Sequence, residues 1–350
     1  MSIDVCYLNR DALFSSETED YRIPAEPDPG QEVTIRFRTA RNDVDQVIYR
    51  ELGQDISVEM EKVSCDEFFD YYEHKITVGE EKVYYYFQII KGGGCCDYNR
   101  LAVRGETLIE QAFCITPGFH TPEWAKGAIM YQIYVDRFCN GDPSNDVETN
   151  EYIYINAPVQ GVKDWEKPLE TIDVGYFYGG DLQGVWDKLD YLQSLSVEVI
   201  YFNPIFVSPS NHKYDCQDYE HIDPHYGVIA EDGGEVLEGS GEEGGNRREE
   251  NKLATKYIAR VTNPVNLEAS DAFFARFVEE VHRRGMKIIL DGVFNHCGSF
   301  NKWLDREGIY EGVRGYEPGA YVSKDSPYHT FFKFEDNSPD QWPYNGSYNG

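Results

Sequence analysis

Apolar and polar residues alternate along several short segments in the first third of the chain. The alternation is regular at 33–38 and looser at 44–50, and the segment 83–90 is rich in tyrosine and phenylalanine before three glycines follow. Short strands separated by Gly and Asp are typical of a β-sandwich. We therefore expect a β-sandwich domain at residues 1–120, with a linker in the Pro- and Gly-containing segment 116–122.

After Trp124 the pattern changes to short apolar strands that alternate with amphipathic helices. Strands are expected at 128–134, 197–202 and 286–290. The side chains expected on the apolar face of the two helices between them are Leu182, Val185, Trp186, Leu189, Leu192 and Leu195, and then Phe273, Phe274, Phe277, Val278 and Val281. Ser270 is expected to cap the second helix and Gly285 to end it. Such repeated strand–helix units predict a parallel sheet that is buried on both faces.

Residues 231–250 are rich in glycine and glutamate and have low complexity. We expect a flexible surface loop inside the second strand–helix unit. A tolerated insertion explains this composition better than a regulatory segment does.

Composition and charge exclude several classes of function. The formal net charge of −30 over 350 residues argues against binding to nucleic acid or to anionic membranes. No segment has the length of a membrane span, and the N-terminus lacks a signal-peptide pattern. Eight cysteines without a C-x-x-C pair predict reduced thiols and a cytoplasmic protein. Aromatic residues, at 15%, suit a carbohydrate binder but suit β-rich domains equally well.

Two segments carry oxygen ligands that could surround a hard cation. The first has four such side chains within seven residues: Asn140, Asp142, Asn145 and Asp146. Calcium accepts six to eight oxygens in irregular geometry, but the same residues also form ordinary turns. In the second segment the backbone carbonyl of Gly179 and the carboxylate of Asp181 could face the same cation, although Asp181 could instead cap the helix that follows.

Polar side chains also follow the second and third predicted strands. His212 and Tyr214 lie in the loop after the second strand, and Asp291, Asn295 and His296 come directly after the third. The carboxyl ends of parallel strands are where α/β folds build active sites. An imidazole, an aromatic ring and a carboxylate are suited to binding a sugar, although single His and Tyr residues in loops are more often structural. No Ser or Cys nucleophile motif and no phosphate-binding glycine loop accompanies them.

Taken together, these segments resemble the α-amylase family, glycoside hydrolase family 13, in its neopullulanase, cyclomaltodextrinase and maltogenic amylase branch. The segments that carry the resemblance are YQIYVDRFCNGDPSND (131–146), YGGDLQGVWDKLDYL (178–192), NPIFVSPSNHKYDCQDYEHIDPHYG (203–227) and DGVFNH (291–296). They occur in the family's order, and the resemblance covers the chain from about Trp124 onward. Residues 1–120 resemble, more weakly, the starch-binding β-sandwich that precedes the barrel in this branch.

The resemblance implies roles for these residues. Asp291 would support the reacting sugar and orient an arginine of the fourth strand, and Asn295 would organise the loop. His296 would bond a sugar hydroxyl, and Tyr214 would stack on the sugar with His212 beside it. The ligands implied for a calcium ion are Asn140, Asp142, Asn145, Asp146, the carbonyl of Gly179 and Asp181.

The implied reaction is the retaining hydrolysis of α-1,4-glucosidic bonds in maltodextrins, cyclodextrins or pullulan-type substrates. It needs a nucleophilic carboxylate and an acid carboxyl roughly 5 Å apart. The family places both after later strands, and no G-x-R-x-D segment occurs in this sequence. We therefore expect the first three strands of a truncated (β/α)8 TIM barrel at 121–296, the start of an inserted domain B at 297–350, and a fragment that is inactive alone.

Alternatives within and outside the family stay open. The parent protein could transfer glycosyl units or cleave α-1,6 bonds, or it could be a non-catalytic glucan-binding protein. The branch also implies a homodimer that forms through the N-terminal domain.

Overall fold

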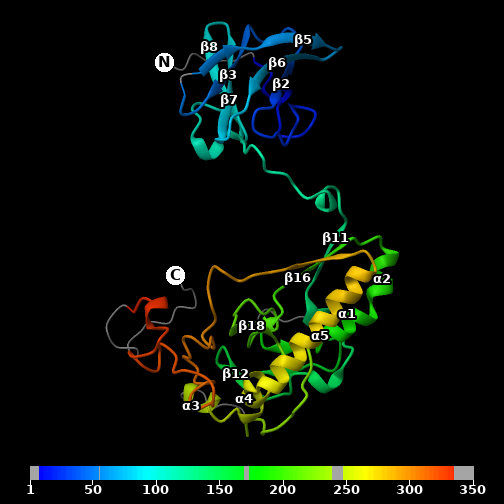
Figure 1. Ribbon diagram of the computed structural model, residues 1–350, viewed down its shortest axis with the longest axis vertical. Coiled ribbons are helices and arrows are strands. Elements are labelled where there is room, and N and C mark those ends of the chain that lie inside the picture. Colours follow the sequence, from blue (N-terminus) through cyan, green and yellow to red (C-terminus); the bar gives the residue numbers. More distant parts are fainter. Residues whose placement is uncertain (1–7, 55, 169–172, 239–246, 335–350) are drawn as a thin grey trace. The chain divides into compact units, whose positions relative to one another are not determined.

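The computed structural model describes residues 8–54, 56–168, 173–238 and 247–334 (Figure 1). It divides into two compact units, Met1–Lys126 and Gly127–Gly350. The segment predicted as a linker is attached to the first unit, because the backbone N–H of Thr121 donates to Glu26 (3.1 Å) and His120 Nε2 lies 2.9 Å from Asp28 Oδ1.

The first unit is a sandwich of two antiparallel sheets, as predicted. One sheet has the order β1 (Arg22–Ile23), β2 (Glu32–Ala40), β6 (Phe69–Thr77), β5 (Glu61–Cys65). The other has the order β4 (Ile56–Glu59), β3 (Gln46–Glu51), β7 (Val83–Lys91), β8 (Gly94–Asn99), β9 (Ala102–Arg104), and β10 (Phe113–Ile115) also pairs with β7.

Alternation along the strands builds the core between these sheets. In β2 the side chains of Val33, Ile35 and Phe37 are buried, while the residues between them are only half-buried. The rings of Phe37 in one sheet and Phe87 in the other lie 4.6 Å apart. The period of two in the sequence therefore identified the inward face correctly.

The second unit contains a three-stranded parallel sheet with the order β11 (Met130–Ile133), β16 (Val199–Phe202), β19 (Lys287–Leu290). The prediction of burial on both faces holds for the central strand β16 only. The outer strands are partly open, since Met130 is 48% and Leu290 39% exposed. Each outer strand pairs on one side only in the described part of the chain, so its side chains lack neighbours on the other.

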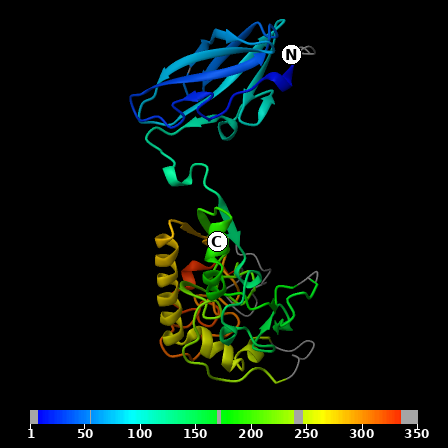
Figure 2. The same ribbon diagram turned by 90° about the vertical axis from the view of Figure 1, so that its right-hand side faces the viewer.

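Three helices pack beside this sheet: α1 (Leu182–Asp187), α2 (Leu189–Ser194) and the long α5 (Pro264–Arg283). Figure 2 shows α5, coloured yellow, as one continuous helix. Phe277 of α5 is fully buried, with its ring 5.9 Å from that of Trp186 and 5.8 Å from that of Phe202. The single helix predicted at 182–195 is interrupted at Lys188.

Ser270 was predicted to cap α5, and that prediction is wrong. The helix begins six residues earlier, where the Asn263 side chain accepts from the N–H of Val265 (3.0 Å) and Pro264 occupies the first position. The hydroxyl of Ser270 instead donates to the carbonyl of Asn266 one turn back (2.8 Å). Gly285, with φ of +82°, ends the helix as predicted.

The glycine- and glutamate-rich segment is not a continuous loop. Residues 247–250 form most of α3 (Arg247–Asn251), and α4 (Thr255–Thr262) follows. Residues 239–246 of the predicted loop lie outside the described residues. Asp232 receives two hydrogen bonds, each 2.9 Å, from Arg260 of α4, so this part of the segment is anchored.

Short strand pairs complete the second unit. They are β12 (Ile153–Tyr154) with β13 (Ala157–Pro158), β14 (Gln160–Gly161) with β15 (Tyr176–Phe177), and β17 (Phe206–Val207) with β18 (Asp218–Ile222). None of the helices in the described ranges has the length and apolar character needed to cross a bilayer.

Candidate functional site

The candidate site lies where β16 and β19 end. Parallel pairing places Phe202 opposite Leu290, so the loops that follow both strands leave the sheet at the same edge. The carboxylate of Asp291 accepts hydrogen bonds from the hydroxyl of Tyr214 (2.7 Å) and from the hydroxyl of Tyr201 (3.0 Å). The predicted Tyr214 and Asp291 are therefore brought together although 77 residues separate them.

Burial and the Asp291 carboxylate act together on the phenol of Tyr214. They raise its pKa to about 12, so this hydroxyl stays a donor at neutral pH. Tyr201, whose pKa is also raised by its bond to Asp291, was missed by the sequence reading. The sequence offered one signal for it: a tyrosine near the carboxyl end of an apolar strand lies close to the edge of the sheet where the site forms.

His212 lies beside Tyr214, with the ring centroids 5.9 Å apart. Its Nδ1 accepts the backbone N–H of Tyr214 (3.1 Å), so the proton of the neutral ring is on Nε2. Burial lowers the pKa of His212, which favours this neutral form. The ring therefore presents one defined N–H donor, with Nε2 3.9 Å from Asp215 Oδ2.

His296 completes the cluster. Its Nε2 lies 3.1 Å from the carbonyl of Tyr214, and its own carbonyl accepts from the hydroxyl of Tyr219 (2.7 Å). The side chain of Asn295 is exposed, and its Nδ2 lies 3.3 Å from Nδ1 of the neighbouring His296. Phe294 between the strand and this pair is 93% exposed. The loop after β19 is therefore held to the loop after β16 through His296.

Lys213, between His212 and Tyr214, was also missed. Its backbone is in the left-handed region (φ +60°) and its side chain is 1% exposed. The ammonium donates to Asp223 Oδ2 (2.6 Å) and to the carbonyl of Ser208 (2.9 Å). A lysine in a polar loop gives no sequence signal of such burial, yet this anchor fixes the two side chains on either side of it.

Further charges continue from this anchor. His225 is buried with Nδ1 2.9 Å from Asp223 and Nε2 2.9 Å from Glu151, so both ring nitrogens face carboxylates. Burial disfavours the imidazolium, but the two carboxylates outweigh it and raise the pKa of His225. Arg260 then donates to Glu151 (2.8 Å).

The residues predicted to bind a cation also converge. A Cβ atom built on Gly179, which has φ of +76°, would lie 2.4 Å from Asp146 Oδ1 and 2.6 Å from Asn140 Nδ2. Asn140 Nδ2 donates to that Asp146 oxygen (2.7 Å). Burial raises the pKa of Asp146 to about 6, and nearby carboxylates including Asp181 add to this. Only glycine fits at 179 with these side chains in place.

Two oxygens in this cluster are orphaned. Asn140 Oδ1 and Asn145 Oδ1 are buried and have no hydrogen-bond partner within the described part of the chain. Within the same ranges, no group of three or more His, Cys, Asp and Glu side chains is arranged to hold a metal ion. Amide oxygens, one carboxylate and a backbone carbonyl are nevertheless the ligand types that calcium accepts.

Asp181 and Asp142 have other contacts. Asp181 caps α1, as the alternative reading predicted, and accepts from the N–H groups of Gly184 (2.6 Å) and Asp142 (2.8 Å). Asp142 accepts from the N–H of Ser144 (3.0 Å) in a tight turn. Both carboxylates thus lie beside the cluster and accept hydrogen bonds from the backbone of its loops.

Comparison with known families matches both units. The family described as "Alpha amylase, catalytic domain" matches residues 132–238 and 269–348. The family described as "Alpha amylase, N-terminal ig-like domain" matches residues 25–115.

Individual relatives cover most of this chain. Neopullulanase 2 of Thermoactinomyces vulgaris is 33% identical over 82% of the chain and 42% of its own length. A cyclomaltodextrinase of Thermoanaerobacter pseudethanolicus is 33% identical over 83% and 42%, and an intracellular maltogenic amylase of Bacillus subtilis is 31% identical over 79% and 41%. The type III pullulan hydrolase from Thermococcus kodakarensis is similar in structure, with a TM-score of 0.47, 26% identity, and 93% of this chain and 46% of that one covered. The chain thus spans less than half the length of these relatives.

Proposed function

Because the chain belongs to the α-amylase family, we propose that the protein hydrolyses α-1,4-glucosidic bonds in maltodextrins, cyclodextrins or pullulan-type substrates with retention of configuration. The observation that carries this proposal is the cluster of Tyr214, Asp291 and His296 at the carboxyl ends of β16 and β19. Relatives named neopullulanase and cyclomaltodextrinase support the substrate class.

In this proposal the residues at the ends of β16 and β19 form the substrate-binding side of the site. The ring of Tyr214 stacks on the sugar, and the Nε2–H of His212 and the His296 ring bond its hydroxyls. Asp291 supports the reacting ring, held by two tyrosine hydroxyls. The nucleophile and the acid are assigned to none of the 350 residues, so we expect this chain alone to bind glucan without hydrolysing it.

Purified chain incubated with maltotriose tests the second half of this proposal. No reducing sugar should be released, and measurable release would refute it. The coding sequence downstream of residue 350 tests the first half, since it should contain a G-x-R-x-D segment; its absence would favour a non-catalytic glucan-binding protein. With a chain that carries such a segment, product analysis on pullulan and panose would separate hydrolysis of α-1,4 bonds from α-1,6 cleavage or glycosyl transfer.

Substrate binding can be tested with maltoheptaose. Tyr214→Ala should weaken binding at this site, whereas Tyr191→Ala, which changes an exposed tyrosine of α2, should not. Equal binding by both variants would contradict the assigned site.

We also propose that the cluster around Gly179 binds calcium. The orphaned oxygens of Asn140 and Asn145 and the half-buried carboxylate of Asp146 support this, since a cation would satisfy them together. Calcium bound to the folded state raises the free energy of unfolding by about 2.7 kcal/mol at a hundred times its Kd. Millimolar calcium should therefore raise the melting temperature, and EDTA should reverse the rise.

A matched pair of variants separates the site from general charge effects. Asp146→Asn should abolish the calcium-dependent rise, and Asp325→Asn, at an exposed position, should retain it. If calcium left the melting temperature of the unmodified chain unchanged, the site would be refuted.

A cytoplasmic location and a homodimer through the first unit belong to the same proposal. The seven cysteines in the described part of the chain are free, and one relative is named as intracellular. Light scattering before and after removal of the first unit would test the dimer.

A further inference from the structure

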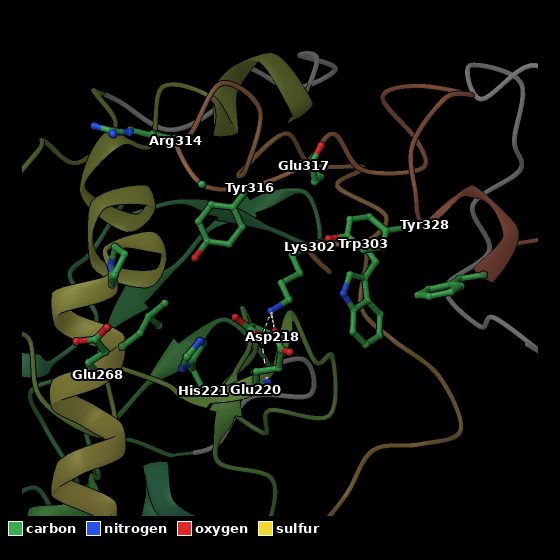
Figure 3. Close-up of a pocket in the computed structure, with 14 residues that line it drawn as sticks. Asp218, Glu220, His221, Glu268, Lys302, Trp303, Arg314, Tyr316, Glu317 and Tyr328 are labelled. Atoms are coloured by element: carbon green, nitrogen blue, oxygen red, sulfur yellow. Dashed lines mark hydrogen bonds and ion pairs between the residues drawn. The ribbon is translucent and has the colours of Figure 1, made fainter.

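A pocket of about 590 Å³ opens in the second unit between β18, the start of α5 and the segments that follow Lys302 (Figure 3). The residues that line it and matter here are Glu268, Lys302, Trp303, Arg314, Tyr316, Glu317, Tyr328 and Phe331. His212, Tyr214, Asp291 and His296 are absent from its lining, so it is a different place from the candidate active site.

Aromatic rings form much of its wall. Figure 3 shows Tyr316 and Trp303 on either side of Lys302, with Tyr328 beside Trp303. The Trp303 ring stacks on Tyr219 at 5.5 Å with an interplanar angle of 17°, and meets Phe331 edge-on at 5.8 Å. Phe331 remains 60% exposed. Aromatic faces at an open surface are suited to stacking against a flat ligand.

The polar groups divide into paired and unpaired ones. Lys302 is held by Asp218 (2.7 Å) and by Glu220, so these three groups form a fixed wall. Glu268, Arg314 and Glu317 are exposed, and no hydrogen bond or ion pair to them is found within the described ranges. Their carboxylates and guanidinium are free to bond a ligand.

Charge decides between classes of ligand. Four carboxylates and two cationic side chains line the pocket, in a chain of net charge −30, which disfavours phosphates and other anions. A pocket that combines four aromatic rings with planar hydrogen-bonding groups fits a neutral ligand with apolar faces and a rim of hydroxyls. A pyranose ring has that chemistry.

We propose that this pocket is a second, non-catalytic binding site for a short α-glucan segment. The proposal rests on the proposed function for the identity of the sugar. Trp303 also links the pocket to the candidate active site, because Tyr219, on which it stacks, donates to the carbonyl of His296 (2.7 Å). A glucan held here would lie against the same structure that positions His296.

A calorimetric titration of the 350-residue chain with maltoheptaose tests the proposal. Glu268→Ala and Arg314→Ala each remove one ligand bond and should weaken one of two binding events about fivefold. Glu279→Ala is the matched control, because Glu279 is an exposed acid eleven residues, about three turns, further along the same helix. It should leave both events unchanged, and the exposed positions of all three side chains keep folding intact.

The outcomes separate the two proposals. If Tyr214→Ala removes one binding event and the pocket variants weaken the other, both stand. If the pocket variants bind as the unmodified chain does, or weaken no more than Glu279→Ala, the second site is refuted while the candidate active site is untouched. If only the pocket variants lose affinity, the second site is supported and the Tyr214 site is wrong.

Discussion

Replacing Lys213 by methionine tests whether the buried ion pair behind the candidate site holds the second unit together. Methionine keeps an unbranched side chain of similar volume, so the change leaves little cavity. It removes the ammonium, which bonds Asp223 at 2.6 Å and the carbonyl of Ser208 at 2.9 Å. Both charged side chains are almost fully buried, so solvent cannot replace the lost partner.

The magnitude follows from what remains around Asp223. Breaking a buried pair by removing one partner costs about 3–5 kcal/mol, because the other charge is left uncompensated. Asp223 keeps the N–H of Ser208 (3.0 Å) and the ring of His225 (2.9 Å), which places the loss at the low end, about 3 kcal/mol. For a unit of this size the melting temperature should fall by about 6–12 °C.

Urea unfolding followed by tryptophan fluorescence suits this test, because four of the five tryptophans lie in the second unit. Lys324→Met, at an exposed lysine, is the control and should change the free energy of unfolding by less than about 0.5 kcal/mol. A loss below about 1 kcal/mol for Lys213→Met would refute the reasoning, since it would mean that the pair is hydrated or absent.

Three further changes have calculable effects. The pKa of His225 is raised above its ordinary value of 6.5 in the folded state, so its protonation stabilises the fold fully below pH 6.5, and this contribution is lost as the pH rises through the folded-state pKa. Urea unfolding midpoints measured from pH 5 to 9 should show this fall, and His225→Gln should make the pH dependence flatter. Asn263→Ala removes the cap of α5 and should cost about 1 kcal/mol in the same assay, with no change expected for Glu279→Ala. Phe277→Ala empties a fully buried position and should cost about 3–5 kcal/mol, and a loss under 1 kcal/mol would show that the packing beside β16 is loose.

The parts of the fold that repeat locally could be predicted from the sequence. Alternation along β2 and the aromatic run of β7 gave both strands within two residues, because one face of each packs on a core. The start of α5 was missed although Asn263-Pro264 is itself a cap-and-first-turn signal. Ser270 lies three residues before Phe273, the first residue of the predicted apolar face, and that face begins well inside the helix.

The sequence indicated some residues of the candidate site, but not their contacts. Position after a strand end selected Asp291 and Tyr214, since the chain direction of parallel strands fixes which edge those residues reach. Burial of Lys213 depends on Asp223, ten residues away, and on a left-handed backbone, neither of which a local pattern encodes. Tyr201 became part of the site only because its hydroxyl reaches across to the neighbouring strand.

The predicted cation cluster and the predicted sugar-binding loop are joined by one chain of buried charges. Arg260 donates to the carbonyl of Asp146 (3.0 Å) and to Glu151 (2.8 Å), and Glu151 leads through His225 to Asp223 and so to Lys213. Each carboxylate in this chain faces a cation, so removing any one group leaves a neighbour buried without its partner. A cation bound beside Asp146 would therefore stabilise the backbone that carries Tyr214, although it touches no sugar.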